Sequence, residues 1–280
     1  ADLVTQVPRG NHDDYLAVIA DLVTKFSIDH IFVGSDEEAL SLSYDNDIRI
    51  KAHIDTPSNI QTILNKSMLY ESVGKTNSGF ELIPSFKLLN NRQDLLDMVK
   101  EFGSVIIRPV MGRGSRGLIH IVDDKLKDNF DLGLKISDYI LPKNPDNYFI
   151  TEYLSGDKYS VDCVFKKGQL LTCMIRNNGP LVKYKPPTMV AMTSTDQDVY
   201  DFAIKIGSVL NLSGFHQIEC AKNDRHCVKL IEMNPRIDAT LPITACYDEN
   251  FYEIIMSDAI KGLLVPKFSM FKRFLTSYTI

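Results

Sequence analysis

A loop rich in glycine and arginine is the first stretch of the sequence that could bind a ligand. The apolar run 105–107 leads to Arg108 and Pro109, and a second apolar run covers 118–122. Three glycines lie between them: Gly112, Gly114 and Gly117. Because glycine accepts positive φ and lets the backbone approach a ligand, the N–H groups of this loop can converge on phosphate oxygens. The positive charge would come from Arg108, Arg113 and Arg116.

Three known types of phosphate-binding loop can be compared with the sequence, and the residues around the glycines distinguish them. The dinucleotide fingerprint matches the spacing of the glycines, but it opens a helix, whereas 118–122 is a short β-rich run. A Walker loop fails because Leu69 stands where a glycine must precede Gly74-Lys75-Thr76. A kinase glycine loop lies between two strands, yet the sequence has no His-Arg-Asp and no Asp-Phe-Gly. An ordinary hairpin with a glycine-rich turn stays open as the alternative.

A second group of polar residues lies on two strand-like segments near the carboxyl end. Glu219 belongs to the segment 214–221, and Glu232 and Asn234 end the segment 228–234. Residues two apart share one face of a strand. Two carboxylates and an amide oxygen suit Mg²⁺, which combines hard protein oxygens with substrate phosphates. Alternating Glu and Asn is also usual on a solvated strand face, so that alternative stays open.

The charges of this second group lead to two expectations. Arg236 follows Pro235 beyond the strand end, where its guanidinium could clamp a phosphate or a carboxylate bidentately. We expect Glu219 and Glu232 to be close like charges with no cation near them. Nucleotide and Mg²⁺ should then bind cooperatively.

The composition indicates a globular protein in a reducing compartment. The 280 residues include 44% hydrophobic ones, enough for packed cores. No apolar run reaches the ~18 residues that cross a bilayer, and the first residues lack a secretion-signal pattern, so we expect a cytoplasmic protein without membrane contact. A net charge of −5 argues against a nucleic-acid partner. The five cysteines form no CxxC pair.

Alternating helix and strand signals open the chain. We expect helix 12–26, strand 28–34, a helix from a capping box at Ser35 to about residue 43, and strand 48–52. This is the pattern of a parallel α/β unit that lacks its first ~35–45 residues, by the usual size of a βαβ unit.

The remaining chain reads as two antiparallel sheets with helices. The expected elements are helix 57–73, strand 83–89, helix 92–102, the glycine-loop hairpin, strand 148–154, the hairpin 159–165 and 169–176, a long loop 177–195, helix 196–212, strands 214–221 and 228–234, and helix 248–262. We expect the long loop to cover a site.

These pieces together resemble the ATP-grasp superfamily over essentially the whole chain. The matching stretches are Asn65-Lys66, Arg108-Pro109 with the glycine loop, Thr151-Glu152-Tyr153-Leu154-Ser155-Gly156, Tyr159-Ser160-Val161-Asp162, Glu219, and Glu232-Met233-Asn234-Pro235-Arg236. The residues of these stretches look closest to those of carbamoyl-phosphate-synthase large chains. The resemblance implies an α+β fold, with a partial Rossmann-like pre-ATP-grasp domain at 1–56, an amino-terminal ATP-grasp subdomain with the lid at 57–153 and a carboxyl-terminal subdomain with the metal site at 154–280.

The resemblance also implies a role for individual residues. Lys66 and Arg108 would hold the α- and β-phosphates under a lid that contains Gly112, Gly114, Ser115 and Gly117. Glu152, Tyr153 and Leu154 would bind adenine, and Lys158 stands where many members have a ribose-binding Glu. Glu219, Glu232 and Asn234 would ligate Mg²⁺ or Mn²⁺. Arg236 and Arg108 would be catalytic, with Arg236 stabilising the transferring phosphoryl group.

The implied reaction is ATP-dependent ligation of a small carboxylate and an amine, with ADP as a product. Positioning and charge neutralisation carry phosphoryl transfer, which agrees with the lack of any Ser/His/Asp or Cys/His arrangement. Two alternatives stay open: a small-molecule kinase on the same scaffold, and a non-catalytic or partner-dependent nucleotide-binding subunit of a split carbamoyl-phosphate-synthase-like enzyme. A homodimer is compatible with either enzyme.

Overall fold

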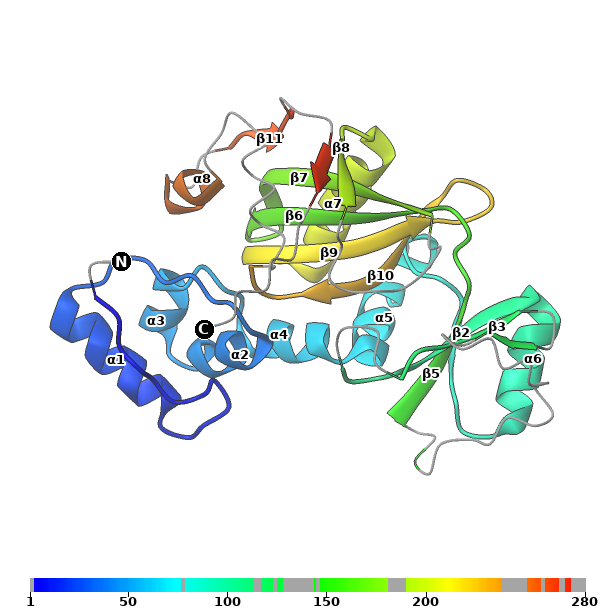
Figure 1. The fold of residues 1–280 in the computed structure, drawn as a ribbon, viewed down its shortest axis with the longest axis horizontal. Helices are drawn as coiled ribbons and strands as arrows, with labels where there is room; N and C mark the ends of the chain where they lie inside the picture. The colour runs from blue at the N-terminus through cyan, green and yellow to red at the C-terminus, as the bar shows by residue number, and fades with distance from the viewer. Residues whose placement is uncertain are drawn as a thin grey trace, which may run out of the picture.

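A computed structural model describes most of the chain. It covers residues 3–76, 79–112, 117–122, 125–127, 144, 147–180, 190–237, 251–257, 260–266 and 270–272. Amino-terminal helices, a smaller sheet and a larger sheet follow one another along the chain (Figure 1).

Three helices build the amino-terminal part: α1 Tyr15–Phe26, α2 Asp36–Ser43 and α3 Asn46–Lys51. The expected capping box is confirmed, since Ser35 accepts from the backbone of Glu38 and the Glu38 carboxylate accepts from the backbone of Ser35. The two expected strands are wrong. Residues 28–34 form no strand, and 48–52 fall largely within α3.

The error at 48–52 has a simple cause. Ile48, Ile50 and Ala52 alternate as in a strand, but Ile48 and Ala52 are also four apart, as on one helix face. Asp45 decides between the two, because its side chain accepts from the N–H groups of Asp47 and Ile48 and so caps a helix. The helix buries Ile48 and Ala52, while Ile50 stays 59% exposed.

The expected helix 57–73 is two helices, α4 Pro57–Leu64 and α5 Lys66–Gly74. The backbone of Asn65 is extended between them, with φ −98° and ψ 103°, and its side chain accepts from the N–H of Met68 at 3.1 Å. This break makes Lys66 the first residue of α5. The break between α4 and α5 therefore determines the position of the Lys66 side chain.

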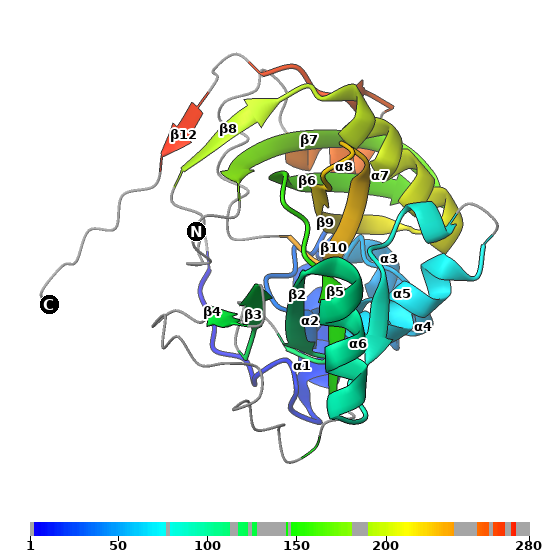
Figure 2. The same cartoon turned by 90° about the vertical axis from the view of Figure 1, so that its right-hand side faces the viewer.

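The smaller sheet has the order β1-β5-β2-β3-β4. Its strands are β1 Phe86–Leu88, β2 Ser104–Pro109, β3 Ile119–Val122, β4 Lys125–Lys127 and β5 Tyr148–Glu152, preceded by the short 3₁₀ helix η1 Gly79–Glu81. The expected hairpin around the glycine loop is confirmed by the antiparallel pairing of β2 with β3. Helix α6 Arg92–Phe102 packs on β2 and β5, as both views show (Figure 2).

The larger sheet has the order β10-β9-β6-β7-β8-β12. Its strands are β6 Asp157–Lys166, β7 Gln169–Pro180, β8 Val190–Ser194, β9 Gly214–Lys222, β10 Val228–Asn234 and β12 Met270–Lys272, and β11 Gly262–Leu263 runs parallel to β7. Its helices are α7 Gln197–Leu210 and α8 Phe251–Ser257. The expected loop 177–195 is partly wrong, since both of its ends lie in strands. The expected helix 248–262 is too long, because β11 begins at Gly262.

Alternation along the larger sheet gives its two faces different characters. One face, with Val161, Ile175 and Ile218, shares an apolar core with α5 and α7. The opposite face carries Ser160 and Glu219, which are cross-strand partners. Since successive side chains on a strand point to opposite faces, the polar residues collect on one side. That side holds the candidate site.

Candidate active site

A row of cross-strand partners crosses the polar face of the larger sheet. Glu232 on β10 lies opposite Glu219 on β9, Glu219 lies opposite Ser160 on β6, and Ser160 lies opposite Arg176 on β7. Directly opposed residues bring their Cβ atoms within about 4.5–5.5 Å, so the two carboxylates are neighbours. Glu219 and Glu232 lie together, as their places near the ends of two successive segments predicted. Their direct pairing across the two strands was not predicted.

Asn234 completes the predicted trio on the same face, two residues beyond Glu232. Its Nδ2 donates to Gln217 Oε1 at 2.7 Å. This hydrogen bond uses the amide nitrogen and leaves the amide oxygen as the atom that can ligate a metal. Two carboxylates and an amide oxygen thus lie together on one sheet face.

Both carboxylates have an ammonium group beside them. Lys158 Nζ forms an ion pair with Glu219 Oε2, and Lys66 Nζ lies 3.7 Å from Glu232 Oε2. The expectation that no cation lies near them is therefore wrong. Lys158 precedes Ser160 by two residues on β6, so the same alternation that gathers the polar residues also brings Lys158 to this face.

Lys66 joins three parts of the site. Its Nζ donates to Gly112 O at 2.5 Å, at the start of the glycine loop, while it also lies near Glu232. Burial lowers the pKa of Lys66, the charge of Glu232 acts to raise it, and the nearby guanidinium of Arg108 lowers it again, so that the pKa lies below its usual value. The two cations expected to bind phosphates are thus close to each other.

Arg108 is buried, with 7% of its surface exposed. Its Nη2 donates to the hydroxyl of Tyr70 at 2.6 Å, and its guanidinium lies over the rings of Tyr70 and Phe149. Its Nε has no hydrogen-bond partner among the described residues. Leaving a buried donor unsatisfied costs about 1–3 kcal/mol, which an arriving anion would recover.

Tyr70 is the site residue that the sequence analysis missed. Its hydroxyl lies 2.9 Å from both Leu230 O and Ile231 O, so it connects Arg108 to β10. In the sequence Tyr70 is only one apolar position of a helix. Its role depends on a pairing 160 residues away, which local patterns do not report.

The segment expected to bind adenine is already held by hydrogen bonds. The N–H of Glu152 donates to Ser85 O and that of Tyr153 to Ser104 O, both at 3.0 Å. The Glu152 carboxylate also accepts from the N–H of Ser85 at 3.3 Å. In the described structure Leu154 is then the residue of this segment whose N–H has no such bond. Of the three residues expected to contact a base through their backbone, only Leu154 therefore has an N–H group that is not already used in the described structure.

The glycine loop is described only at its two ends. Gly112 and Gly117 have φ of 137° and 73°, in the region that favours glycine. A Cβ on Gly117 would also lie 3.1 Å from Pro109 Cγ. The expected phosphate-binding residues Gly114 and Ser115, together with Arg113 and Arg116, lie outside the described residues.

Comparisons with known proteins bear on the fold of the chain. A family model described as ATP-grasp in the biosynthetic pathway with Ter operon matches residues 144–272. An L-amino acid ligase from Bacillus licheniformis matches with a TM-score of 0.64 and 13% identity, over 94% of this chain and 64% of that one. The chain has the ATP-grasp fold. No curated protein sequence matches it.

Two further solved structures share the ATP-grasp fold. The biotin carboxylase domain of a 2-oxoglutarate carboxylase from Hydrogenobacter thermophilus, in complex with MgADP and bicarbonate, matches with a TM-score of 0.63 and 15% identity, over 91% of this chain and 59% of that one. N5-carboxyaminoimidazole ribonucleotide synthetase from Thermotoga maritima matches with a TM-score of 0.58 and 16% identity, over 91% and 64%. The chain spans less than two thirds of each of these three proteins. At these identities the likeness concerns the fold, and the finer resemblance to carbamoyl-phosphate synthases stays a prediction.

Arg236 links this site to the amino-terminal helices. Its Nε donates to Asp36 Oδ1 at 3.0 Å, and its Nη1 donates to Ile237 O at 3.2 Å. Asp36 is the first residue of α2, and its charge acts to raise the pKa of Lys66, which burial still holds below its usual value. Arg236 is therefore linked to Lys66 through Asp36, the carboxylate that is its own ion-pair partner.

The described residues fit a nucleotide with Mg²⁺. The unsatisfied Nε of Arg108 suits a phosphate oxygen, and the three oxygen donors of Glu219, Glu232 and Asn234 suit a hard cation. Among the described residues, no group of three or more His, Cys, Asp or Glu residues could hold a metal ion, and this site offers two carboxylates and an amide oxygen. None of its helices is long and apolar enough to cross a membrane.

Proposed function

We propose that the chain is an ATP-dependent ligase that joins a small carboxylate to an amine. The observation that carries this proposal is that Lys66 lies beside both Arg108 and Glu232, with Glu219 directly opposite Glu232. Lys66 Nζ lies 3.7 Å from Glu232 Oε2, and Arg108 is tied through Tyr70 to the same strand. Paired cations and oxygen ligands of this kind position phosphates and neutralise the charge of phosphoryl transfer. The ligases among the similar structures support the choice of reaction.

The reaction has two balanced steps. A carboxylate oxygen of the substrate attacks the γ-phosphorus, the bond to the β,γ-bridging oxygen breaks, and ADP leaves. The amine then attacks the carbonyl carbon of the acyl phosphate, inorganic phosphate leaves, and the amine loses a proton to solvent. Lys66 and Arg108 would hold the phosphates, and Arg236 would face the charge that develops on the transferred group. Glu219, Glu232 and Asn234 would hold Mg²⁺, which would supply positive charge to the phosphates.

The remaining finer assignments belong to the same proposal. Leu154 would read the base edge beside Glu152 and Tyr153, and the glycine loop would close over the phosphates. The division at 1–56, 57–153 and 154–280, a cytoplasmic location and a homodimer stay part of it.

The direct test is ADP release from MgATP against a panel of amino acids and small carboxylates. Glu232→Gln should lower ADP release by about 100-fold or more, because it removes charge from the metal site without changing shape. Glu101→Gln, at an exposed position on α6, is the matched control and should match wild type. Equal release from wild type and Glu232→Gln would refute the proposed site.

One observation favours a second candidate, a nucleotide-binding subunit that depends on a partner. Arg236 is already engaged by Asp36, so it is not poised toward the phosphates in this arrangement. A protein of this kind would bind MgATP in calorimetry yet release no ADP with any carboxylate and amine. That result would replace the ligase proposal by the subunit.

A further inference from the structure

Lys158 departs from the ATP-grasp pattern and lies on a residue of the expected metal site. Its Nζ pairs with Oε2 of Glu219, and Ser160 Oγ donates to Oε1 of the same carboxylate at 3.3 Å. The ion pair is largely shielded, with 21% of the Lys158 side chain and 14% of the Glu219 side chain exposed. Within the described structure, Glu219 thus has an ion-pair partner at Oε2, which accepts no hydrogen bond, and a hydrogen-bond donor at Oε1.

The need for a cation here follows from the pairing of the strands. Glu232 lies directly opposite Glu219, and like charges at opposed positions destabilise a sheet. Lys66 lies beside Glu232 and Lys158 lies on Glu219, so each carboxylate has its own ammonium group. This arrangement neutralises the metal site from within the chain.

We propose that Lys158 is a built-in counter-cation of the metal site, which occupies Glu219 in the absence of metal and competes with a divalent cation for it. A metal that binds Glu219 must displace the ammonium group, because two cations at one carboxylate oxygen repel each other. Phosphate and ribose oxygens of the arriving nucleotide would receive the displaced Lys158. The proposal rests on the proposed function only in taking Glu219 as a metal ligand.

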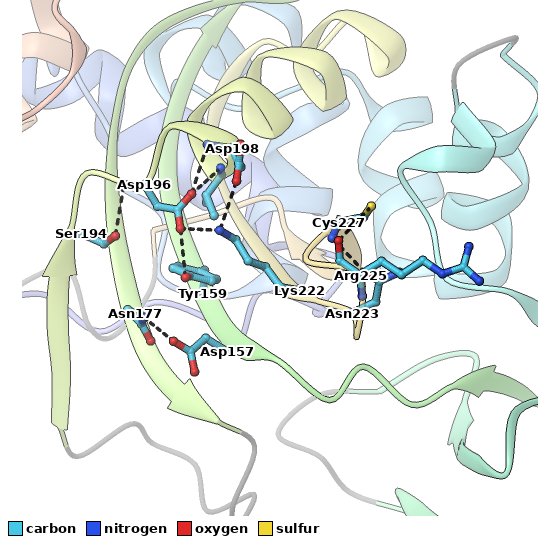
Figure 3. A network of polar contacts seen from close by, with 11 residues as sticks. Asp157, Tyr159, Asn177, Ser194, Asp196, Asp198, Lys222, Asn223, Arg225 and Cys227 are labelled. Atoms are coloured by element: carbon cyan, nitrogen blue, oxygen red, sulfur yellow. Dashed lines mark hydrogen bonds and ion pairs between the residues drawn. The ribbon is translucent and has the colours of Figure 1, made fainter.

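A second lysine of the same sheet, Lys222, forms an ion pair away from the expected metal site and serves as a comparison for Lys158. Lys222 Nζ, on β9, lies 2.7 Å from Asp196 Oδ2 and 3.3 Å from Asp198 Oδ2 (Figure 3). Asp196 also caps α7 and accepts from the hydroxyl of Tyr159 at 3.1 Å. Asp196 therefore has structural bonds that do not depend on Lys222, and no carboxylate of the expected metal site takes part. Lys222 is the matched control for Lys158.

The test measures binding of Mn²⁺ alone to the full chain, by calorimetry and without nucleotide. Lys158→Gln should bind Mn²⁺ about tenfold more tightly than wild type. This factor corresponds to an ion pair whose strength lies between those of exposed and buried pairs. Lys158→Arg, which keeps the charge, and Lys222→Gln should keep the wild-type affinity. Lys158→Gln/Glu219→Gln should lose the gain. Unchanged or weaker Mn²⁺ binding by folded Lys158→Gln would overturn the proposal.

A second measurement needs no variant. The rate at which an amine-acetylating reagent modifies Lys158 and Lys222 is followed by mass spectrometry in wild type, with and without saturating Mg²⁺. Mg²⁺ should speed modification of Lys158 severalfold and leave Lys222 unchanged, because only Lys158 loses its partner. Equal rates at Lys158 in both conditions would count against displacement. Neither experiment involves ATP turnover, so the outcome is independent of whether the chain is a ligase.

Discussion

The hydroxyl of Tyr70 offers the sharpest test of how the phosphate site is built. Tyr70→Phe removes the acceptor 2.6 Å from Arg108 Nη2 and the group 2.9 Å from two carbonyl oxygens of β10. The ring is fully buried and keeps its edge contacts with Phe86 and Phe149, so the change leaves no cavity. The loss of stability therefore comes from the hydrogen bonds alone.

The magnitude follows from the charge of the donor. Leaving a buried polar group unsatisfied costs about 1–3 kcal/mol, with charged donors at the upper end. We expect the free energy of unfolding to fall by about 2–3 kcal/mol, measured as a lower urea midpoint with an unchanged m-value. Affinity for ADP should fall by about tenfold, or 1.4 kcal/mol, because Arg108 is no longer held against β10.

Tyr44→Phe is the matched control. The Tyr44 hydroxyl accepts from Gln61 Nε2 at 2.9 Å, but Tyr44 is 60% exposed, so water can replace the lost bond. This control should change stability by less than about 0.5 kcal/mol. If Tyr70→Phe and Tyr44→Phe destabilise the protein equally, the hydroxyl of Tyr70 does not join Arg108 to the larger sheet in the way described.

Three further predictions concern the catalytic charge, the glycine loop and pH. Arg236→Ala should lower ADP release by about 10²–10³-fold with little change in ATP affinity, whereas Asp36→Asn, which removes only the partner at 3.0 Å, should cost less than about tenfold; equal losses would give Arg236 a structural role. Hydrogen exchange over 111–117 should slow when an ATP analogue binds, and equal exchange in both states would contradict phosphate binding. Burial acts to raise the pKa of Asp55, but the hydrogen bond and charge interaction with His216 and hydrogen bonds from two backbone N–H groups together outweigh it, so the pKa lies below its usual value. Its contribution to stability should be complete above the unfolded pKa and disappear as pH falls through the lower folded one, so Asp55→Asn should flatten the acid limb of a stability profile; an unchanged acid limb would be evidence against this role.

Local signals in the sequence predicted the elements whose ends are fixed locally. The capping box at Ser35 lies where the residue types indicated, because it uses a bond to a neighbour three residues away. The expected helix 92–102 is confirmed as α6, and the structure shows that Asn91 caps it in the same way. The hairpins β2–β3 and β6–β7 were likewise predictable from apolar runs and turn residues. Segments 28–34 and 48–52 were not, since a short apolar run fits either a strand or a helix and packing decides between them.

The candidate site likewise has features that the sequence predicted and features that it did not. Alternation predicted that Glu232 and Asn234 would share a face, Glu219 was expected to converge with them, and the resemblance supplied their expected roles. The partners of these residues come from other strands and helices: Lys158 from β6 and Lys66 from α5. Which cation meets which carboxylate depends on the register of the larger sheet and on the break at Asn65. Neither the register of the larger sheet nor this break can be predicted from a single local stretch of sequence.

The two phosphate cations differ in type for a reason that the site itself supplies. Arg108 is enclosed by the rings of Tyr70 and Phe149 and by its own strand, where burial would deprotonate a lysine more readily. A guanidinium stays charged there and can stack on both rings while one edge binds the Tyr70 hydroxyl. Lys66 lies at a helix start beside Glu232, whose charge acts against the effect of burial on its pKa. The aromatic cage thus explains why arginine stands at 108, and the nearby carboxylate explains why a lysine suffices at 66.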